Sequence, residues 1–294
     1  MINRILIFFV MLTFPTTAAF ADDGGHDTRC SAVSDISACN ELVAQQRVKL
    51  AENTQGKGFG PQSPRDIDSR SGRNGIIFSD APPYAEMNLC NIHFHNGAEH
   101  KGGEFTTFMS RGDGSGYANG YQYDGDLGPQ EITPIGGAIC PGEGGSLAPG
   151  DTIEVHYVHT TADVAPGKGL GACLSQAAQN PQLRVEAQVF VLVNDQSALD
   201  FGSLTALSGT GKGARATGIP SDTGTPVQYA GSTTGPSYNE VGSPLQVSWS
   251  VRPRVAKVDI QSVGKWCRGN VFEESEAHGT RNLILNPDLL SEIK

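Results

Sequence analysis

Two short segments of this chain, 91–100 and 151–160, hold five of its seven histidines. Polar and apolar residues alternate over 90–95 and 151–159, which is typical of a β-strand, where side chains two positions apart share a face. His93 and His95 are therefore expected to point the same way, while the residues between and beside them point into the opposite layer. The chain must fold so that strands bring these histidines to one place.

The second segment supplies a third imidazole. His156 and Glu154 share one face of the predicted strand, and His159 points to the other face. Three neutral imidazoles leave one open position on a tetrahedral ion, which is the pattern of catalytic zinc. We therefore expect Zn²⁺ to be held by His93, His95 and His156, with Glu154 accepting the N–H of a ligand imidazole. Ordinary burial of polar histidines is the alternative interpretation.

The first residues of the chain resemble a cleavable secretory signal. Arg4 precedes an apolar run over 5–14, and Ala19 and Ala21 form a small-residue cleavage pattern. We expect residues 1–21 to be removed, leaving a periplasmic or secreted protein with no membrane attachment. Six cysteines in an exported chain predict disulfide bonds, whose pairing the sequence leaves open. The net charge of -10 argues against a nucleic-acid partner, and the oligomeric state stays open.

The remaining chain is expected to form an N-terminal extension, 22–58, and a larger catalytic unit, 59–294. Apolar residues recur at helical spacing between Ser31 and Asn53, so the extension is predicted to contain a helix. Beyond it, β-branched and aromatic residues recur with period two between Gly-, Pro-, Asn- and Asp-rich stretches, which predicts a mainly β fold with long loops. The predicted strands are 90–95, 151–159, 183–193, 245–251 and 255–263.

Several motifs resemble those of one enzyme family. The segments HFH at 93–95, EH at 99–100 and EVHYVHT at 154–160 resemble the zinc strands of the alpha-class carbonic anhydrases, which read HFHW, SEH and ELHLVHW. Outside the histidines, further segments resemble that class in the same order: QSPRDID at 62–68, YAGSTTGP at 229–236, the QVSWSVRP that follows it, and GTRNLILNP at 279–287.

The run MNLCNIHFHNGAEHKGGEF at 87–105 is similar, at almost every position, to the delta class of carbonic anhydrases, a distant relative of the alpha class. A short stretch between QSP and HFH and a long insertion between Glu99 and Glu154 also set the chain apart from the alpha class. The resemblance covers about residues 60 to 290. It implies an alpha-carbonic-anhydrase-like central twisted, mostly antiparallel sheet with long loops and a few short helices.

The resemblance also implies an activity, the reversible hydration of carbon dioxide to bicarbonate and a proton by a zinc-bound hydroxide. Thr233 would orient that hydroxide, and Glu99 would accept the proton of Thr233. Thr234 would lie close to the substrate oxygens. The chain lacks the leucine that the alpha class has after Ser232, so the choice between the two threonines stays open. No residue is assigned to carry the released proton to solvent.

Two other functions fit part of the pattern. H-x-H followed by Glu99 also resembles the first motif of cupins, in which the glutamate would be a ligand of iron or manganese together with a later histidine. The asparagine that the second cupin motif has after its histidine is missing here. A periplasmic metal-binding protein would use the same histidines and would need neither an open position nor a threonine.

Overall fold

The computed structural model describes residues 60–110, 116–233 and 245–293, together with three single helical positions, Ala44, Val48 and Glu52. The predicted signal and the rest of the predicted N-terminal helix lie outside the described residues, as do Cys30, Cys39 and Thr234. The domain boundaries expected from the sequence therefore stay predictions. Within the described part, no helix is both long enough and apolar enough to cross a membrane.

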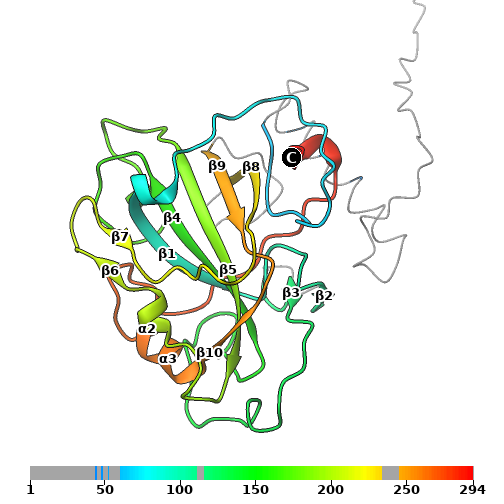
Figure 1. Cartoon of the computed structure of the whole chain (residues 1–294), viewed down its shortest axis with the longest axis vertical. Coiled ribbons are helices and arrows are strands. Elements are labelled where there is room, and N and C mark those ends of the chain that lie inside the picture. The colour runs from blue at the N-terminus through cyan, green and yellow to red at the C-terminus, as the bar shows by residue number, and fades with distance from the viewer. Residues whose placement is uncertain are drawn as a thin grey trace, which may run out of the picture.

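A six-stranded mixed sheet forms the centre of the molecule (Figure 1). Five strands follow the order β1-β4-β5-β9-β8, and β10 pairs with β5. The pairs β1–β4, β4–β5 and β8–β9 are antiparallel, whereas β5 pairs in parallel with both β9 and β10. The strands are β1 (Asn88–Asn96), β4 (Thr152–Thr160), β5 (Leu183–Val193), β8 (Val227–Thr233), β9 (Leu245–Val251) and β10 (Ala256–Asp259). The prediction of a mainly β fold is confirmed.

The other described elements are short. Two small sheets pair β2 with β3 and β6 with β7, and two short helices, α2 and α3, lie side by side next to β10 (Figure 1). The bounds are β2 (Thr107–Phe108), β3 (Tyr121–Gln122), β6 (Leu207–Ser208), β7 (Arg215–Ala216), α2 (Phe201–Leu204) and α3 (Ile260–Cys267), with 3-10 turns η2 (Tyr84–Glu86), η3 (Leu170–Cys173) and η4 (Pro287–Leu289).

The predicted strand 255–263 is wrong in its second half. β10 ends at Asp259 and α3 begins at the next residue. The Asp259 carboxylate accepts a hydrogen bond from a backbone N–H two residues later, which is the N-cap arrangement that starts a helix. Ile260, Val263 and Trp266 are buried at a spacing of three, so a helical face lies inside a stretch whose β-branched residues suggested a strand.

Apolar residues pack on both faces of the sheet, and the proposed metal ligands lie on one of them. Ile92, Phe94, Val155 and Tyr157 point into a hydrophobic core that α2 and α3 cover. On the other face of the same strands, His93 lies opposite His156 and His95 lies opposite Glu154, next to a second hydrophobic cluster. The alternation predicted for the strands 90–95 and 151–159 is therefore confirmed.

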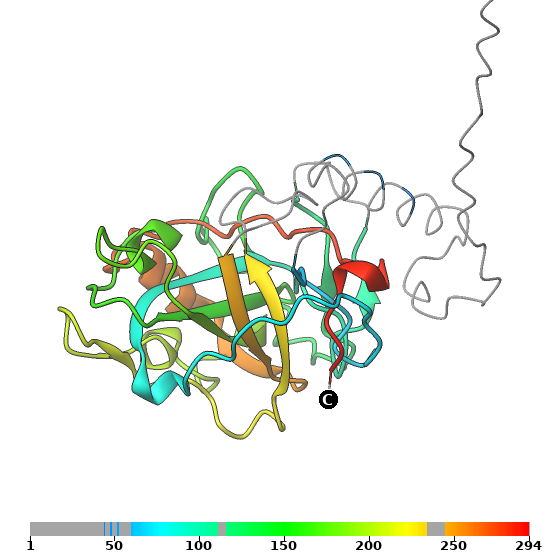
Figure 2. The same ribbon diagram turned by 90° about the horizontal axis from the view of Figure 1, so that it is seen from above.

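Segments from outside the sheet complete the histidine side. The chain after α3 runs back across the molecule to η4 (Figure 2). On the way, the backbone of His278 pairs with β1: its N–H donates to the Phe94 carbonyl, and its carbonyl accepts from the Asn96 N–H. Two disulfides fix further segments. Cys90–Cys173 joins β1 to η3, and Cys140–Cys267 joins the chain before β4 to α3.

Candidate metal centre

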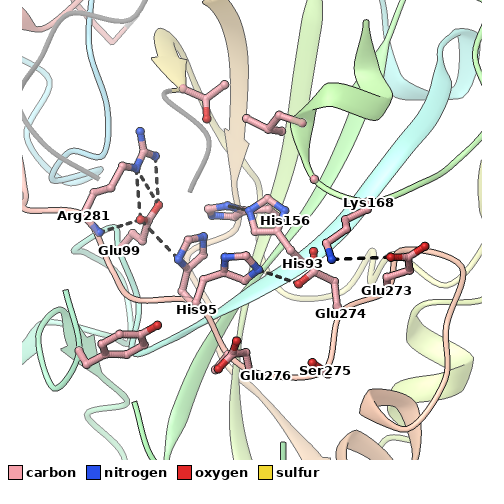
Figure 3. Close-up of a pocket in the computed structure, with 16 residues that line it drawn as sticks. His93, His95, Glu99, His156, Lys168, Glu273, Glu274, Ser275, Glu276 and Arg281 are labelled. Carbon is pink, nitrogen blue, oxygen red and sulfur yellow. Dashed lines mark hydrogen bonds and ion pairs between the residues drawn. The ribbon is translucent and has the colours of Figure 1, made fainter. Parts of the chain in front are cut away.

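The pairing of β1 with β4 brings three imidazoles together. His93 lies directly opposite His156, and His95 lies opposite Glu154. Their ligand-type nitrogens all lie within 4.8 Å of one another. Figure 3 shows the three rings grouped around one space, with the Arg281–Glu99 pair on one side and Glu274 on the other.

The ring of His93 is held in one orientation by Asn91. The Nδ1 atom of His93 is 2.6 Å from the side-chain oxygen of Asn91, and the amide nitrogen of Asn91 donates to the Gly167 carbonyl at 3.0 Å. The second contact requires nitrogen at that end of the amide, so its oxygen faces the imidazole. Nδ1 of His93 must then carry the proton, which leaves Nε2 as a lone-pair donor.

The rings of His95 and His156 are fixed in the same way. His95 Nδ1 donates to the Gly279 carbonyl at 2.9 Å, and His156 Nε2 donates to the Glu154 carboxylate at 2.8 Å. The nitrogens left to face the common space are His95 Nε2 and His156 Nδ1. His95 Nε2 is buried and has no hydrogen-bond partner among the described residues. A buried polar atom without a partner is costly, and a metal ion would satisfy it.

The protonation of the rings also suits a metal ion. Burial lowers the pKa of His93 well below its usual value, and the neighbouring His156 and His95 lower it further. Burial likewise lowers the pKa of His95 to about 3. Both rings are therefore neutral at physiological pH, which is the form that binds metal. Imidazole nitrogens from three histidines fit a divalent transition metal such as Zn²⁺.

Glu154 lies in the interior of the protein. It is 0% exposed, so it is not a glutamate on a surface strand edge. Its Oε1 also accepts from His100 Nδ1 at 2.6 Å, and its Oε2 accepts from the His100 backbone N–H at 3.0 Å. His100 Nε2 in turn contacts the Tyr229 hydroxyl at 2.7 Å. The contact with His156 is therefore one end of a buried chain of hydrogen bonds that keeps the carboxylate in place.

Glu99 forms a buried ion pair with a residue that the sequence did not single out, Arg281. The carboxylate accepts from the Arg281 backbone N–H at 2.8 Å and from its guanidinium at 3.0 Å. Burial raises the pKa of Glu99, but Arg281 and His95 outweigh that effect and bring it down to about 2. Glu99 is thus a carboxylate at neutral pH and carries its negative charge beside the three rings.

Thr233 ends β8 and is 8% exposed, with its side chain at the same cavity as the three rings and Glu99. The carbonyl of the preceding Ser232 accepts hydrogen bonds from the Ser63 hydroxyl and from Trp249 Nε1. Ser63 lies in the QSP motif, and its own carbonyl accepts from Arg281 at 3.2 Å. Thr233 and Glu99 therefore line the same cavity. Hydrogen bonds also connect them indirectly: Ser63 donates to the carbonyl of the residue before Thr233, and Arg281 donates both to the Ser63 carbonyl and to Glu99.

The cavity has a volume of about 300 Å³, and two segments outside the central sheet line part of it. One wall is the segment 168–170, and the other is 273–278. An exposed ion pair links the two walls, with Lys168 Nζ 3.6 Å from Glu273 (Figure 3). These walls are the part of the site for which the motifs gave no indication.

His278, in the second wall, was also missed. Its ring centroid is 5.3 Å from that of His93, and its Nε2 is 2.6 Å from the Glu274 carboxylate. Burial lowers its pKa, but the contact with Glu274 outweighs this and the pKa is raised. The only available signal was its position next to the GTRNLILNP motif. His159, by contrast, lies on the far face of β4, where its Nδ1 donates to the Tyr157 carbonyl at 3.0 Å.

Comparison with known proteins gives a family. A sequence model of the family described as Delta carbonic anhydrase matches residues 84–262, more than half of the chain. Among solved structures, one similar chain is the alpha-carbonic anhydrase from Thermovibrio ammonificans in complex with the inhibitor sulfanilamide; the identity is 12%, the TM-score is 0.31, and the match covers 76% of this chain and 83% of that chain. No curated protein matches the sequence. The delta-class resemblance seen at 87–105 is confirmed by the family match.

Proposed function

The chain belongs to the delta carbonic anhydrase family, and from that membership we propose that it hydrates carbon dioxide reversibly to bicarbonate with a Zn²⁺ ion held by His93, His95 and His156. The observation that carries this proposal is the orientation of the three rings. Each has its other nitrogen bound to a fixed oxygen, so that one nitrogen of each of the three rings faces one space. Three protein donors leave a tetrahedral ion one open position for a reacting oxygen.

Bound Zn²⁺ would supply hydroxide at neutral pH, because the ion lowers the pKa of its water; a value of about 7 is known for carbonic anhydrases. The protein's part is then to orient the attacking oxygen. In our proposal Thr233 does so by accepting a hydrogen bond from it, which requires that Thr233 give its own hydroxyl proton to an acceptor. Glu99 is that acceptor, since its pKa of about 2 keeps it ionised.

Thr234, outside the described residues, is assigned to the neighbourhood of the substrate oxygens and is the alternative orienting group. The small-molecule partners are carbon dioxide and bicarbonate. We place the protein in the periplasm or outside the cell, after removal of residues 1–21. The disulfides Cys90–Cys173 and Cys140–Cys267 support an oxidising compartment.

The proposal is tested by metal analysis and stopped-flow hydration rates on the purified mature protein. We expect about one Zn²⁺ per chain and carbon dioxide hydration that is lost when the zinc is removed. Thr233→Ala should keep its zinc and lose about 10²-fold in rate, as expected when one positioned hydrogen-bonding group is removed from a preorganised site. Thr233→Ser should recover much of the rate, because the hydroxyl is the acting group.

Thr234→Ala is the matched control for the one-residue ambiguity. Whichever alanine variant loses more activity identifies the orienting hydroxyl. Full activity in both Thr233→Ala and Thr234→Ala would contradict the proposed role of this turn, and a zinc-loaded protein without hydration activity would contradict the proposed function itself.

A further inference from the structure

We infer that the Cys90–Cys173 disulfide positions the metal ligand His93, through Asn91 and the backbone of Gly167, and thereby sets the metal affinity of the site. The inference rests on the proposed function in one respect, the role of His93 as a ligand. It goes beyond that function because it assigns the disulfide and one wall of the cavity a role in orienting a metal ligand.

The first link is Asn91, which is 0% exposed and has both ends of its side chain engaged. Its oxygen accepts from His93 Nδ1 at 2.6 Å, and its nitrogen donates to the Gly167 carbonyl at 3.0 Å. The position of the Gly167 carbonyl therefore decides which end of the amide faces His93. A displaced Gly167 would free the amide to turn, and the ring of His93 would lose its fixed tautomer and direction.

The second link is the anchoring of Gly167 to β1. The Gly167 N–H donates to the Cys90 carbonyl at 3.0 Å, so the segment starts against the residue that precedes Asn91. Six residues later the segment is covalently joined to the same Cys90 through Cys173. The Cys173 carbonyl accepts from the Thr160 hydroxyl at 2.8 Å, at the end of β4. The segment 167–173 is thus attached to Cys90 at both ends, by a hydrogen bond at Gly167 and by the disulfide at Cys173.

The third link is the wall of the cavity. Between Gly167 and Cys173 the chain contains a single 3-10 turn, η3, and it presents Lys168, Gly169 and Leu170 to the cavity. A segment this short cannot hold its own shape by helical hydrogen bonds. The covalent tie at Cys173 is therefore what we expect to hold the wall, and with it the carbonyl on which Asn91 depends.

The chain contains a matched control in the second described disulfide. Cys140–Cys267 closes a longer loop, with a sequence separation of 127 against 83 for Cys90–Cys173, so its effect on the unfolded chain is at least as large. It joins the apolar core on the other face, where Cys140 packs and α3 ends. Its loss should lower stability without moving His93.

The experiment compares Cys90→Ser/Cys173→Ser with Cys140→Ser/Cys267→Ser and measures Zn²⁺ affinity by competition with a chromogenic chelator. Loss of a partner that orients a ligand lowers metal affinity by about 10- to 100-fold. We expect a loss in that range for the first variant and a change of less than about 2-fold for the second, since only the first bridge reaches a ligand. Equal losses, or no loss in the first variant, would overturn the inference.

Asn91→Ala separates positioning from a general loss of rigidity. If the disulfide acts through Asn91, removing the disulfide from the Asn91→Ala variant should lower its Zn²⁺ affinity no further. Independent effects of the disulfide and of Asn91 would instead add. Strict additivity in the Asn91→Ala/Cys90→Ser/Cys173→Ser variant overturns the inference. Asn91→Ala also serves if the cysteine variant does not fold, because it keeps both disulfides; wild-type affinity in that variant would overturn the inference.

The result can be distinguished from a failure of the proposed function. Wild-type protein that binds no Zn²⁺ would overturn both. Wild-type protein that binds Zn²⁺ and hydrates carbon dioxide, together with unchanged affinity in Cys90→Ser/Cys173→Ser, would leave the proposed function standing and remove this inference alone. As an independent readout, the visible spectrum of the Co²⁺-substituted protein should change in the first cysteine variant, because it reports the ligand geometry that His93 helps to set.

Discussion

Replacing Arg281 with methionine should destabilise the protein strongly. The hydrogen bonds of Arg281 to other described residues go to Glu99 and Ser63 and not to the three proposed metal ligands. Arg281 is 6% exposed and Glu99 is 1% exposed, so water cannot replace the guanidinium. Its side chain donates to Glu99 and to the Ser63 carbonyl. Methionine fills similar volume but donates nothing, which leaves a buried carboxylate without its cation.

The burial of the pair gives the size of the loss. Removing one partner of a buried ion pair costs about 3 to 5 kcal/mol. The pKa of Glu99 agrees in direction: burial raises it, but Arg281, with His95 and His156, lowers it from 4.5 to about 2, so the ionised carboxylate stabilises the folded state. Because the folded-state pKa is the lower one, this stability is present above the unfolded pKa and is lost as the pH falls through about 2.

Urea denaturation of the metal-free protein at neutral pH measures the effect, so that zinc binding does not enter. Arg281→Met should lower the free energy of unfolding by about 3 kcal/mol or more. The double variant Glu99→Gln/Arg281→Met is the matched control: with the charge gone, it should be more stable than Arg281→Met alone. A loss below about 1 kcal/mol, or a double variant no more stable than the single one, would refute the assignment of this pair as a buried ionic contact.

Three further predictions concern the metal and pH. Glu99→Gln should keep its zinc and hydrate carbon dioxide poorly, whereas loss of zinc on metal analysis would favour the cupin-like iron or manganese alternative, in which Glu99 is a ligand. His156→Ala should lose zinc and His159→Ala should keep it; the reverse result would show that the assignment of strand faces to the ligands is wrong. The metal-free protein should lose stability as the pH falls from 6.5 towards 3, because the pKa values of His93 and His95 are lowered on folding and the unfolded chain binds more protons in that range. His95→Gln should flatten this dependence in denaturation curves, and an unchanged slope would contradict it.

The histidine strands could be predicted because their information is local. A period of two fixes which side chains share a face, and Ile92, Phe94, His93 and His156 lie as that period requires. The same rule places Asn91 on the face of His93, so this positioning residue could have been found from the sequence. What the period could not show is the partner of its amide, because Gly167 lies 76 residues further along the chain.

The rest of the site depends on contacts that no local pattern encodes. Arg281 meets Glu99 across a sequence separation of 182, and His95 meets the Gly279 carbonyl across 184. Both partners lie in an irregular segment without helical or strand period. The incorrect strand at 255–263 has a different cause, since its β-branched residues suit a strand while its Asp259 N-cap and buried spacing of three favour a helix.

These contacts divide the work of the site between two parts of the chain. The three proposed ligands and Glu99 lie within residues 84–262, the range that matches the family. The groups that orient His95 and neutralise Glu99, Gly279 and Arg281, come after it. Strand pairing alone therefore brings the imidazoles close, but it does not choose the tautomer of His95 or keep Glu99 ionised in the interior. The metal centre is complete only when the C-terminal segment lies beside β1. A change that unfolds this segment should therefore also disturb the geometry of the metal ligands.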